Sequence, residues 1–245
     1  MMYMGSKYKI GKRIIEAIKN DLKEQNLTEM TWVEPFAGSL GMLFHTGGIF
    51  GKRIASDADE DVITLWQRMQ EGYVPPEDVT AEIYQSVRFN QSQHPKELVA
   101  FIKNGCSFGG KSWGGFAKPD SGGRNYPAEA SRLCQKKIAR CMDVEFFHCV
   151  YQNLEKIAVT KFNQQTVVYC DPPYANTTGY SKDGFNHREF WAWCVEMAKR
   201  GSIVYVSEYS KPDSVDADLI WEMTRKNALS QKTKVQTEKL YRVRS

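Results

Sequence analysis

Long apolar runs are missing from this 245-residue chain, and stretches such as Ile203–Val206 fall far short of the roughly 18 residues that span a bilayer. The N-terminus shows no apolar segment of the signal-peptide kind and carries charge from Lys7 onward. Internal repeats and low-complexity tracts are also lacking. These absences exclude a fibrous or repeat protein and predict a cytoplasmic protein with no membrane partner.

Cysteine and histidine are scarce and scattered. The six cysteines are never closer than seven residues apart, no C-x-x-C pair occurs, and the four histidines do not cluster with them. This spacing predicts reduced, mostly buried thiols and argues against a disulfide framework or a metal site.

Composition and length describe an ordinary globular chain. Hydrophobic residues make up 42% and charged residues 25% of the sequence, which excludes a disordered chain. At this length a domain buries roughly 70–75% of its unfolded surface. We expect one large domain, or one domain that carries an insertion.

The order of the predicted elements is that of a Rossmann-like α/β fold. An amphipathic helix over 9–24 precedes a short strand, a glycine turn, a second strand that ends at Asp57, and a helix over 60–70. Strand patterns then return after a long interval. The predicted strands are 31–34, 52–56, 144–148, 166–170 and 202–207, with a helix over 187–200 and edge strands at 219–223 and 240–243.

The interval between the strands is basic and rich in glycine. From Tyr84 to Arg140 the chain has ten Lys or Arg against three acids, a net charge of +7, and seven of its 18 glycines. A basic block inside a slightly acidic chain is typical of a polyanion-binding region. We therefore expect residues 1–83 and 141–245 to form the main α/β domain, and 84–140 to be an inserted recognition region of helices and loops.

The strongest chemical signal is Asp171-Pro172-Pro173-Tyr174, directly after an apolar strand. Two prolines cannot continue a sheet ladder and hold the backbone extended. A carboxylate and a carbonyl then lie at the carboxyl end of the strand, where α/β proteins bind ligands. Such a pair can accept both protons of an amino group, and Tyr174 offers a flat face for a ring.

This string resembles the D-P-P-Y motif of DNA adenine-N6 methyltransferases, and other motifs follow the order of their Dam-like, D12-class branch. Residues Met2–Lys7 resemble the leading motif of that branch, Glu34–Ser39 resemble its S-adenosyl-L-methionine (AdoMet) turn, and Ser56–Asp59 resemble its acidic motif. The resemblance extends to Ser207–Tyr209 and Lys239–Tyr241. It implies AdoMet as the cofactor, double-stranded DNA as the partner and no metal.

The resemblance also assigns roles. Tyr3 would stack on the adenine of AdoMet, Lys7 would reach both cofactor and target, and Gly38 would admit the methionine end. Asp57 lies 19 residues after Gly38, the separation at which Rossmann-like folds place an acid on ribose hydroxyls; Asp59 or Asp61 is the alternative. The implied cofactor-binding residues are Tyr3, Lys7, Pro35, Phe36, Gly38, Asp57 and Asp171, and the implied catalytic residues are Asp171, Pro172, Pro173 and Tyr174.

The chain departs from the family pattern at two places. Leu40 stands where the family turn usually has a second glycine, with Gly41 next, so the loop is either longer by one residue or remodelled. The acid often found after the strand at 144–148 is absent from 146–151. The second departure bears on AdoMet affinity more than on the type of reaction.

Within 84–140 the loop Cys106–Phe116 alternates glycines, aromatics and a lysine. Aromatic side chains can wedge between bases, and basic side chains neutralise phosphates. The candidate DNA-binding residues are Lys111, Trp113, Lys118, Arg124, Asn125, Lys136, Lys137 and Arg140. The basic cluster between Lys226 and Arg244 is the alternative DNA surface.

The sequence therefore predicts transfer of a methyl group from AdoMet to the N6 amine of an adenine that is flipped out of the duplex. One alternative is methylation of cytosine N4, by enzymes that more often carry serine at the position of Asp171. Methylation of RNA or of a glutamine side chain would have similar needs, and the glutamine enzymes usually carry asparagine there. A DNA-binding relative without catalysis is the alternative from another class. A homodimer is compatible with the sequence, but no feature of the sequence predicts the oligomeric state.

Overall fold

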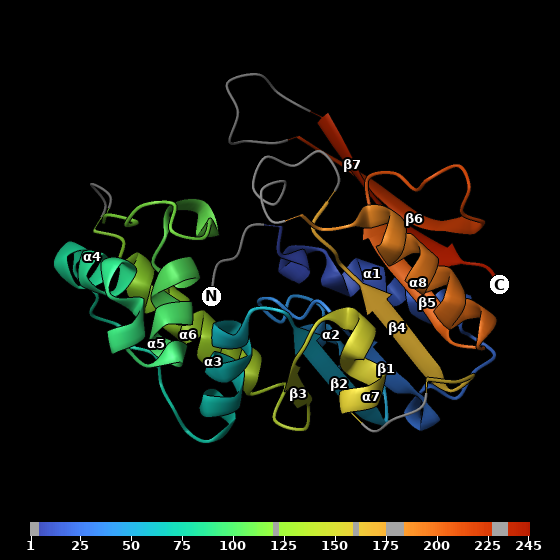
Figure 1. Cartoon of the computed structure of the whole chain (residues 1–245), viewed down its shortest axis with the longest axis horizontal. Helices are drawn as coiled ribbons and strands as arrows, with labels where there is room; N and C mark the ends of the chain where they lie inside the picture. Colours follow the sequence, from blue (N-terminus) through green and yellow to red (C-terminus); the bar gives the residue numbers. More distant parts are fainter. Residues whose placement is uncertain (1–4, 120–122, 159–161, 175–183, 227–234) are drawn as a thin grey trace.

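Seven strands form one twisted sheet in the computed structural model, which describes residues 5–119, 123–158, 162–174, 184–226 and 235–245 (Figure 1). Their order across the sheet is β3-β2-β1-β4-β5-β7-β6. The strands are β1 (Thr31–Glu34), β2 (Lys52–Asp57), β3 (Glu145–His148), β4 (Thr166–Cys170), β5 (Ile203–Glu208), β6 (Ala217–Lys226) and β7 (Val235–Val243).

The first five strands are parallel, and β7 runs antiparallel between β5 and β6. The expected strand at 240–243 is therefore not an edge strand, and only β6 borders that side of the sheet. Leu240 and Tyr241 are consecutive and so point to opposite faces, yet both are buried, as an interior strand requires. The expected edge position of 219–223 is confirmed within β6.

Helices cover both faces of the sheet, which explains why the strands are almost continuously apolar. On one face Trp32 and Tyr169 pack with the helices α1 (Gly11–Asp21) and α3 (Glu60–Gln70). On the other face Val33 and Val168 pack with α7 (Leu154–Ile157) and α8 (His187–Lys199). The Rossmann-like α/β fold expected from the sequence is confirmed.

The basic interval folds into a helical lobe beside the sheet, on the left in Figure 1. It contains α4 (Ala81–Phe89), α5 (Lys96–Ala100) and α6 (Tyr126–Ile138), and a short helix α2 (Leu43–Thr46) precedes β2. Residues of this lobe, including Tyr84, Phe101 and Cys134, share one buried cluster with Ile14 of α1 and Trp66 of α3. The lobe is therefore fixed to the sheet through a common core.

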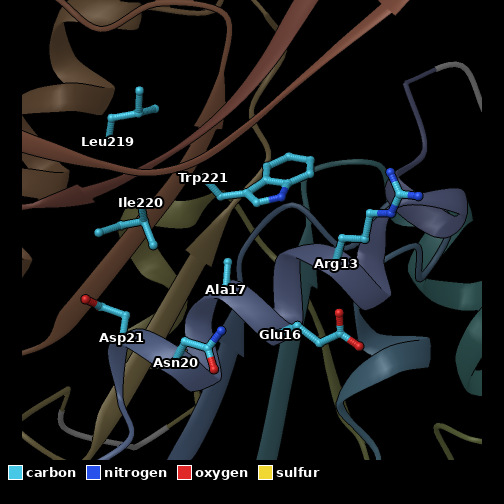
Figure 2. Close-up of a pocket in the computed structure, with 8 residues that line it drawn as sticks. All are labelled: Arg13, Glu16, Ala17, Asn20, Asp21, Leu219, Ile220 and Trp221. Carbon is cyan, nitrogen blue, oxygen red and sulfur yellow. The ribbon is translucent and has the colours of Figure 1, made fainter.

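Several other features bear on function. All six cysteines are buried and free, as expected. Among the described residues, no group of His, Cys, Asp and Glu is placed to hold a metal ion, and no helix is long and apolar enough to cross a membrane. A hollow of about 680 Å³ lies between α1 and β6, lined among others by Arg13, Asp21 and Trp221 (Figure 2). The described residues that line this hollow include none of the predicted cofactor-binding, catalytic or DNA-binding residues.

Candidate active site

Three acidic side chains follow neighbouring strands at the same edge of the sheet. Glu34 ends β1, Asp57 ends β2 and Asp171 follows β4, and β1 lies between the other two strands. Carboxyl ends of parallel strands at a change of strand order form the usual ligand crevice of an open α/β sheet. The motifs predicted from separate parts of the sequence are thus assembled in one place.

The glycine turn after β1 is tied directly to the end of β2. The Gly38 amide donates a hydrogen bond of 2.8 Å to Oδ2 of Asp57, and the Asp59 amide donates one of 2.9 Å to Oδ1. Trp66 of α3 donates from its indole nitrogen to the Gly38 carbonyl, at 2.9 Å. Burial raises the pKa of Asp57, and the two amide hydrogen bonds oppose that shift. Asp57 therefore shapes the turn, whatever else it binds.

The backbone of Leu40 explains how the turn lacks its second glycine. Leu40 has φ +56°, the left-handed conformation that normally favours glycine, and its side chain is fully buried. The turn thus keeps a glycine-like backbone at this position, with leucine in a left-handed conformation of the kind that costs roughly 1 kcal/mol or more. The reason for glycine at position 41 is steric, because a Cβ there would lie 3.0 Å from the Lys7 amide nitrogen.

Lys7 reaches from the leading motif to Asp171. Its Nζ lies 2.7 Å from Oδ1 of Asp171 and 3.5 Å from Oε1 of Glu238, and its side chain is only 4% exposed. Burial by itself would lower the pKa of Lys7, but the two carboxylates outweigh it and raise that pKa. We conclude that the buried lysine is an ammonium ion between two acids.

Glu238 of β7 is a site residue that the sequence did not reveal. It accepts a hydrogen bond from the phenol of Tyr174, and its side chain is 11% exposed. Tyr174 also packs edge-on against Tyr209, with ring centroids 4.6 Å apart, and lies 4.5 Å from the Lys7 Nζ. The sequence offered one signal for Glu238, an acid directly before the Lys239–Tyr241 motif. Its partners Lys7 and Tyr174 belong to distant segments of the chain, so the contacts could not be foreseen.

The other residues predicted to bind the cofactor differ in their burial and in their partners. Pro35 is buried, and the Phe36 ring packs against Tyr151 and Phe190 at centroid distances of 5.5 and 5.6 Å. Asp59 is paired with Lys103 of the lobe at 2.5 Å, whereas Asp61 is half-buried. Tyr3 lies outside the described residues.

Lys137 corrects the expected DNA surface. Its side chain has no exposed area, and its Nζ donates to the Ser39 carbonyl at 2.6 Å and to the Ser39 hydroxyl at 3.2 Å. The prediction that Lys137 contacts a phosphate is wrong, because α6 turns this residue inward while Lys136 remains outside. A run of two lysines on a helix cannot indicate which one faces the core.

Ion pairs also reduce the positive field that composition suggested. Arg124 forms a two-point pair with Glu129, and Lys96, Lys103 and Arg132 pair with acids outside the basic interval. Asn125 caps α6 by accepting a hydrogen bond from the Ala128 amide at 3.0 Å. In the alternative C-terminal cluster, Arg242 and Arg244 pair with Asp21 and Asp218, and residues 227–234 lie outside the described part.

The aromatic loop divides into packed and exposed members. Trp113 is partly buried and meets Tyr84 edge-on at 5.6 Å, and Phe116 packs on the same core. Phe108 is instead 67% exposed, beside Gly109 and Gly110, which both have positive φ. Lys111 and Lys118 are exposed, as are Lys136 and Arg140 beside the Phe44 ring.

Strand order, the turn after β1, the acid after β2 and the Asp171–Tyr174 string together define a Rossmann-like AdoMet-dependent methyltransferase. The sequence model of the D12 class N6 adenine-specific DNA methyltransferases matches residues 3–104. The resemblance expected from the motifs is therefore confirmed by this match.

Two DNA adenine methylases are similar to the chain in sequence. A DNA adenine methylase of Vibrio cholerae is 26% identical over 211 residues, which are 76% of this chain and 70% of that protein. A DNA adenine methylase of Escherichia coli K12 is 30% identical over 187 residues, or 62% of this chain and 61% of that protein. A solved AdoMet-dependent methyltransferase from Agrobacterium tumefaciens has a TM-score of 0.45 and 9% identity, covering 95% of this chain and 62% of that one.

Proposed function

We propose that the chain methylates the exocyclic N6 amine of adenine in double-stranded DNA, with AdoMet as the donor and the target base flipped out of the duplex. The observation that carries this proposal is the Lys7–Asp171 pair at 2.7 Å, held at the carboxyl end of β4 beside two prolines and Tyr174. The D12 relationship supports the same reaction.

Asp171 and Pro172 act on the target amine in this proposal. The Asp171 carboxylate and the Pro172 carbonyl each accept one N–H, which draws the nitrogen toward tetrahedral geometry and frees its lone pair. Tyr174 offers its ring to the base, and the hydrogen bond to Glu238 and the edge-on contact with the Tyr209 ring fix its orientation. Positioning of this kind supplies much of the rate of a direct transfer.

The charges around the site suit a reaction that carries positive charge to the amine. Lys7, Asp171 and Glu238 together bear one net negative charge, because one ammonium ion stands between two carboxylates. A fixed negative site stabilises the cationic nitrogen that forms as the methyl group arrives. The same charge attracts the cofactor, whose sulfonium supplies the methyl group when it is bound.

The turn at Gly38 and the acid Asp57 are suited to hold the cofactor. Gly38 has φ +44° and is partly exposed at the carboxyl end of β1, and each Asp57 oxygen keeps a further lone pair for a ribose hydroxyl. We therefore assign Gly38, Asp57 and Lys7 to cofactor binding, together with Pro35 and Phe36 as the walls of the turn.

We further propose that residues 84–140 read the DNA. Lys111, Lys118, Lys136 and Arg140 are exposed and, among the described residues, make no ion pair, so they remain available for phosphates. Phe108 is the exposed aromatic of the loop, and Arg124 and Asn125 remain candidates for base contacts.

Incubation with AdoMet and mixed-sequence duplex DNA, followed by mass analysis of the nucleosides, tests this function. The expected product is N6-methyladenine. N4-methylcytosine in its place would identify the cytosine alternative, and methylation of an RNA substrate alone would identify the RNA alternative. AdoMet binding without any methylated nucleoside would favour the catalytically silent relative.

A further inference from the structure

Lys137 connects the recognition lobe to the turn that we assign to the cofactor. It lies on α6, and its ammonium bonds both the carbonyl and the hydroxyl of Ser39, the residue after Gly38. The Ser39 hydroxyl also lies 2.9 Å from the hydroxyl of Ser6, next to Lys7. The Lys137 Nζ is 4.9 Å from the ring centroid of Tyr8, which follows Lys7.

Three segments therefore meet around one buried side chain: the N-terminal segment of Ser6 and Tyr8, the glycine turn, and α6. The arrangement is specific because Lys137 offers a directional donor to a backbone carbonyl, whereas an apolar side chain of similar length would only fill the space. Burial of an ammonium ion carries a desolvation cost. Burial lowers the pKa of Lys137 to about 8, so the ion is largely present at neutral pH.

We propose that Lys137 is a positioning residue that fixes the Gly38–Ser39 turn for AdoMet and joins the cofactor site to α6 of the recognition lobe. This inference rests on the proposed function. Ser39 cannot move away from α6 without breaking both bonds to Lys137, and its hydroxyl in turn holds the Ser6 segment. A displacement of α6 on DNA binding would therefore also displace the Gly38–Ser39 turn. A displacement of that turn on AdoMet binding would likewise displace α6.

Lys137→Met tests the proposal, because methionine keeps the length of the side chain and loses the donor. A charged hydrogen bond contributes about 1.5–3 kcal/mol, so AdoMet binding measured by calorimetry should weaken by roughly tenfold or more. Lys199→Met is the matched control, since Lys199 is an exposed lysine in the last turn of α8 to which no role is assigned. It should leave AdoMet affinity unchanged.

A second measurement separates positioning from general loss of stability. The AdoMet affinities of Lys137→Met, Ser39→Ala and the double variant form a thermodynamic cycle, and the proposal expects non-additive effects. Ser39→Ala removes only one of the two acceptors and keeps the test open if Lys137→Met does not fold. The proposal also couples the AdoMet site to the DNA side of the lobe, and such coupling acts equally in both directions. Any effect of bound AdoMet on DNA affinity should therefore be smaller in Lys137→Met than in the parent.

The outcomes are distinguishable from failure of the function itself. If the parent chain binds AdoMet and methylates DNA while folded Lys137→Met binds AdoMet equally well, the positioning role is overturned and the function stands. Additive effects in the cycle would also overturn it. If the parent binds no AdoMet, the proposed function fails, and the role of Lys137 fails with it.

Discussion

The ammonium of Lys7 and the carboxylate of Asp171 lie 2.7 Å apart although 164 positions separate them in the chain. The first belongs to a short segment before α1, and the second follows the central strand β4. The fold brings them together because Gly41 lets the Ser6–Tyr8 backbone lie against the cofactor turn. The pair thus links the leading motif to the residue that we assign to the target amine.

Replacement of Asp171 by Ala should abolish methyl transfer while AdoMet binding stays weakened but measurable, because the carboxylate acts on the target amine. Asp171→Asn keeps the size of the side chain and loses the charge, so a loss of roughly 10²–10³ in kcat is expected. Single-turnover assays with saturating AdoMet measure both variants. Parental turnover in either variant would remove Asp171 from the mechanism.

The pH dependence should reveal Glu238. Burial raises the pKa of Asp171, Lys7 opposes the shift, and the nearby Glu238 carboxylate adds to it. Since protonation of Asp171 removes an acceptor, kcat/KM falls as the pH drops through that raised pKa. Glu238→Gln removes a neighbouring negative charge, which lowers the pKa of Asp171 and should move the acid limb of the pH profile to lower pH.

Glu238→Gln should also reduce the maximal rate, because the amide holds Lys7 and Tyr174 less firmly. A merely structural role for Glu238 would lower stability and leave the acid limb in place. Glu222, an exposed acid on the neighbouring β6, provides the control substitution Glu222→Gln, for which neither change is expected.

Local patterns sufficed for much of the fold. The strand at 31–34 and the strand ending at Asp57 coincide with β1 and β2, because a continuous apolar run bounded by a turn has few other solutions. The place of β7 inside the sheet was not predicted, since alternation in sequence does not say which strand will lie beside it. Leu240 and Tyr241 become interpretable only once β5 and β6 are placed.

Side-chain partners were harder to foresee. The Asp57 and Asp171 positions followed from motif and spacing, whereas Glu238 and Lys137 depend on contacts between segments far apart in the chain. Arg53 is a similar case: its buried guanidinium on β2 bonds the carbonyls of Leu43 and Arg140 and pairs with Asp143. Sequence alone marks such residues only as charges.

Asp57→Ala should weaken AdoMet binding by about 1–3 kcal/mol, because it removes an acceptor that we assign to ribose hydroxyls and that also holds the Gly38 amide. Asp61→Ala is the matched control and tests Asp61 as the alternative acid, whereas Asp59 is already paired with Lys103. Isothermal calorimetry with AdoMet measures both. Greater weakening in Asp61→Ala would transfer the ribose contact to that residue.

The salt dependence of DNA binding tests the exposed lysines and arginines of the lobe. A footprint of about five phosphates predicts a slope near −4.5 when the logarithm of the DNA-binding constant is plotted against the logarithm of the salt concentration. The double variant Lys136→Ala, Arg140→Ala should make that slope shallower by roughly 1.8. Lys137 is left unchanged because it is buried. Removal of the exposed Lys23 and Lys199 is the control, and an equal effect there would move the DNA surface away from the lobe.

Phe108 provides the sharpest test of how the loop meets DNA. Its side chain is 67% exposed on a backbone bent by Gly109 and Gly110, so little of the fold depends on it. If it stacks on or wedges between bases, Phe108→Ala should weaken DNA binding by about 1–3 kcal/mol, with AdoMet affinity and the melting temperature unchanged. Leu219→Ala on β6 is the control, because it removes another exposed apolar side chain, 49% exposed, at the opposite edge of the sheet. Phe108→Tyr should retain binding, since the ring is kept. If Phe108→Ala binds DNA as tightly as the parent, the contact must come from the charged residues of the lobe alone.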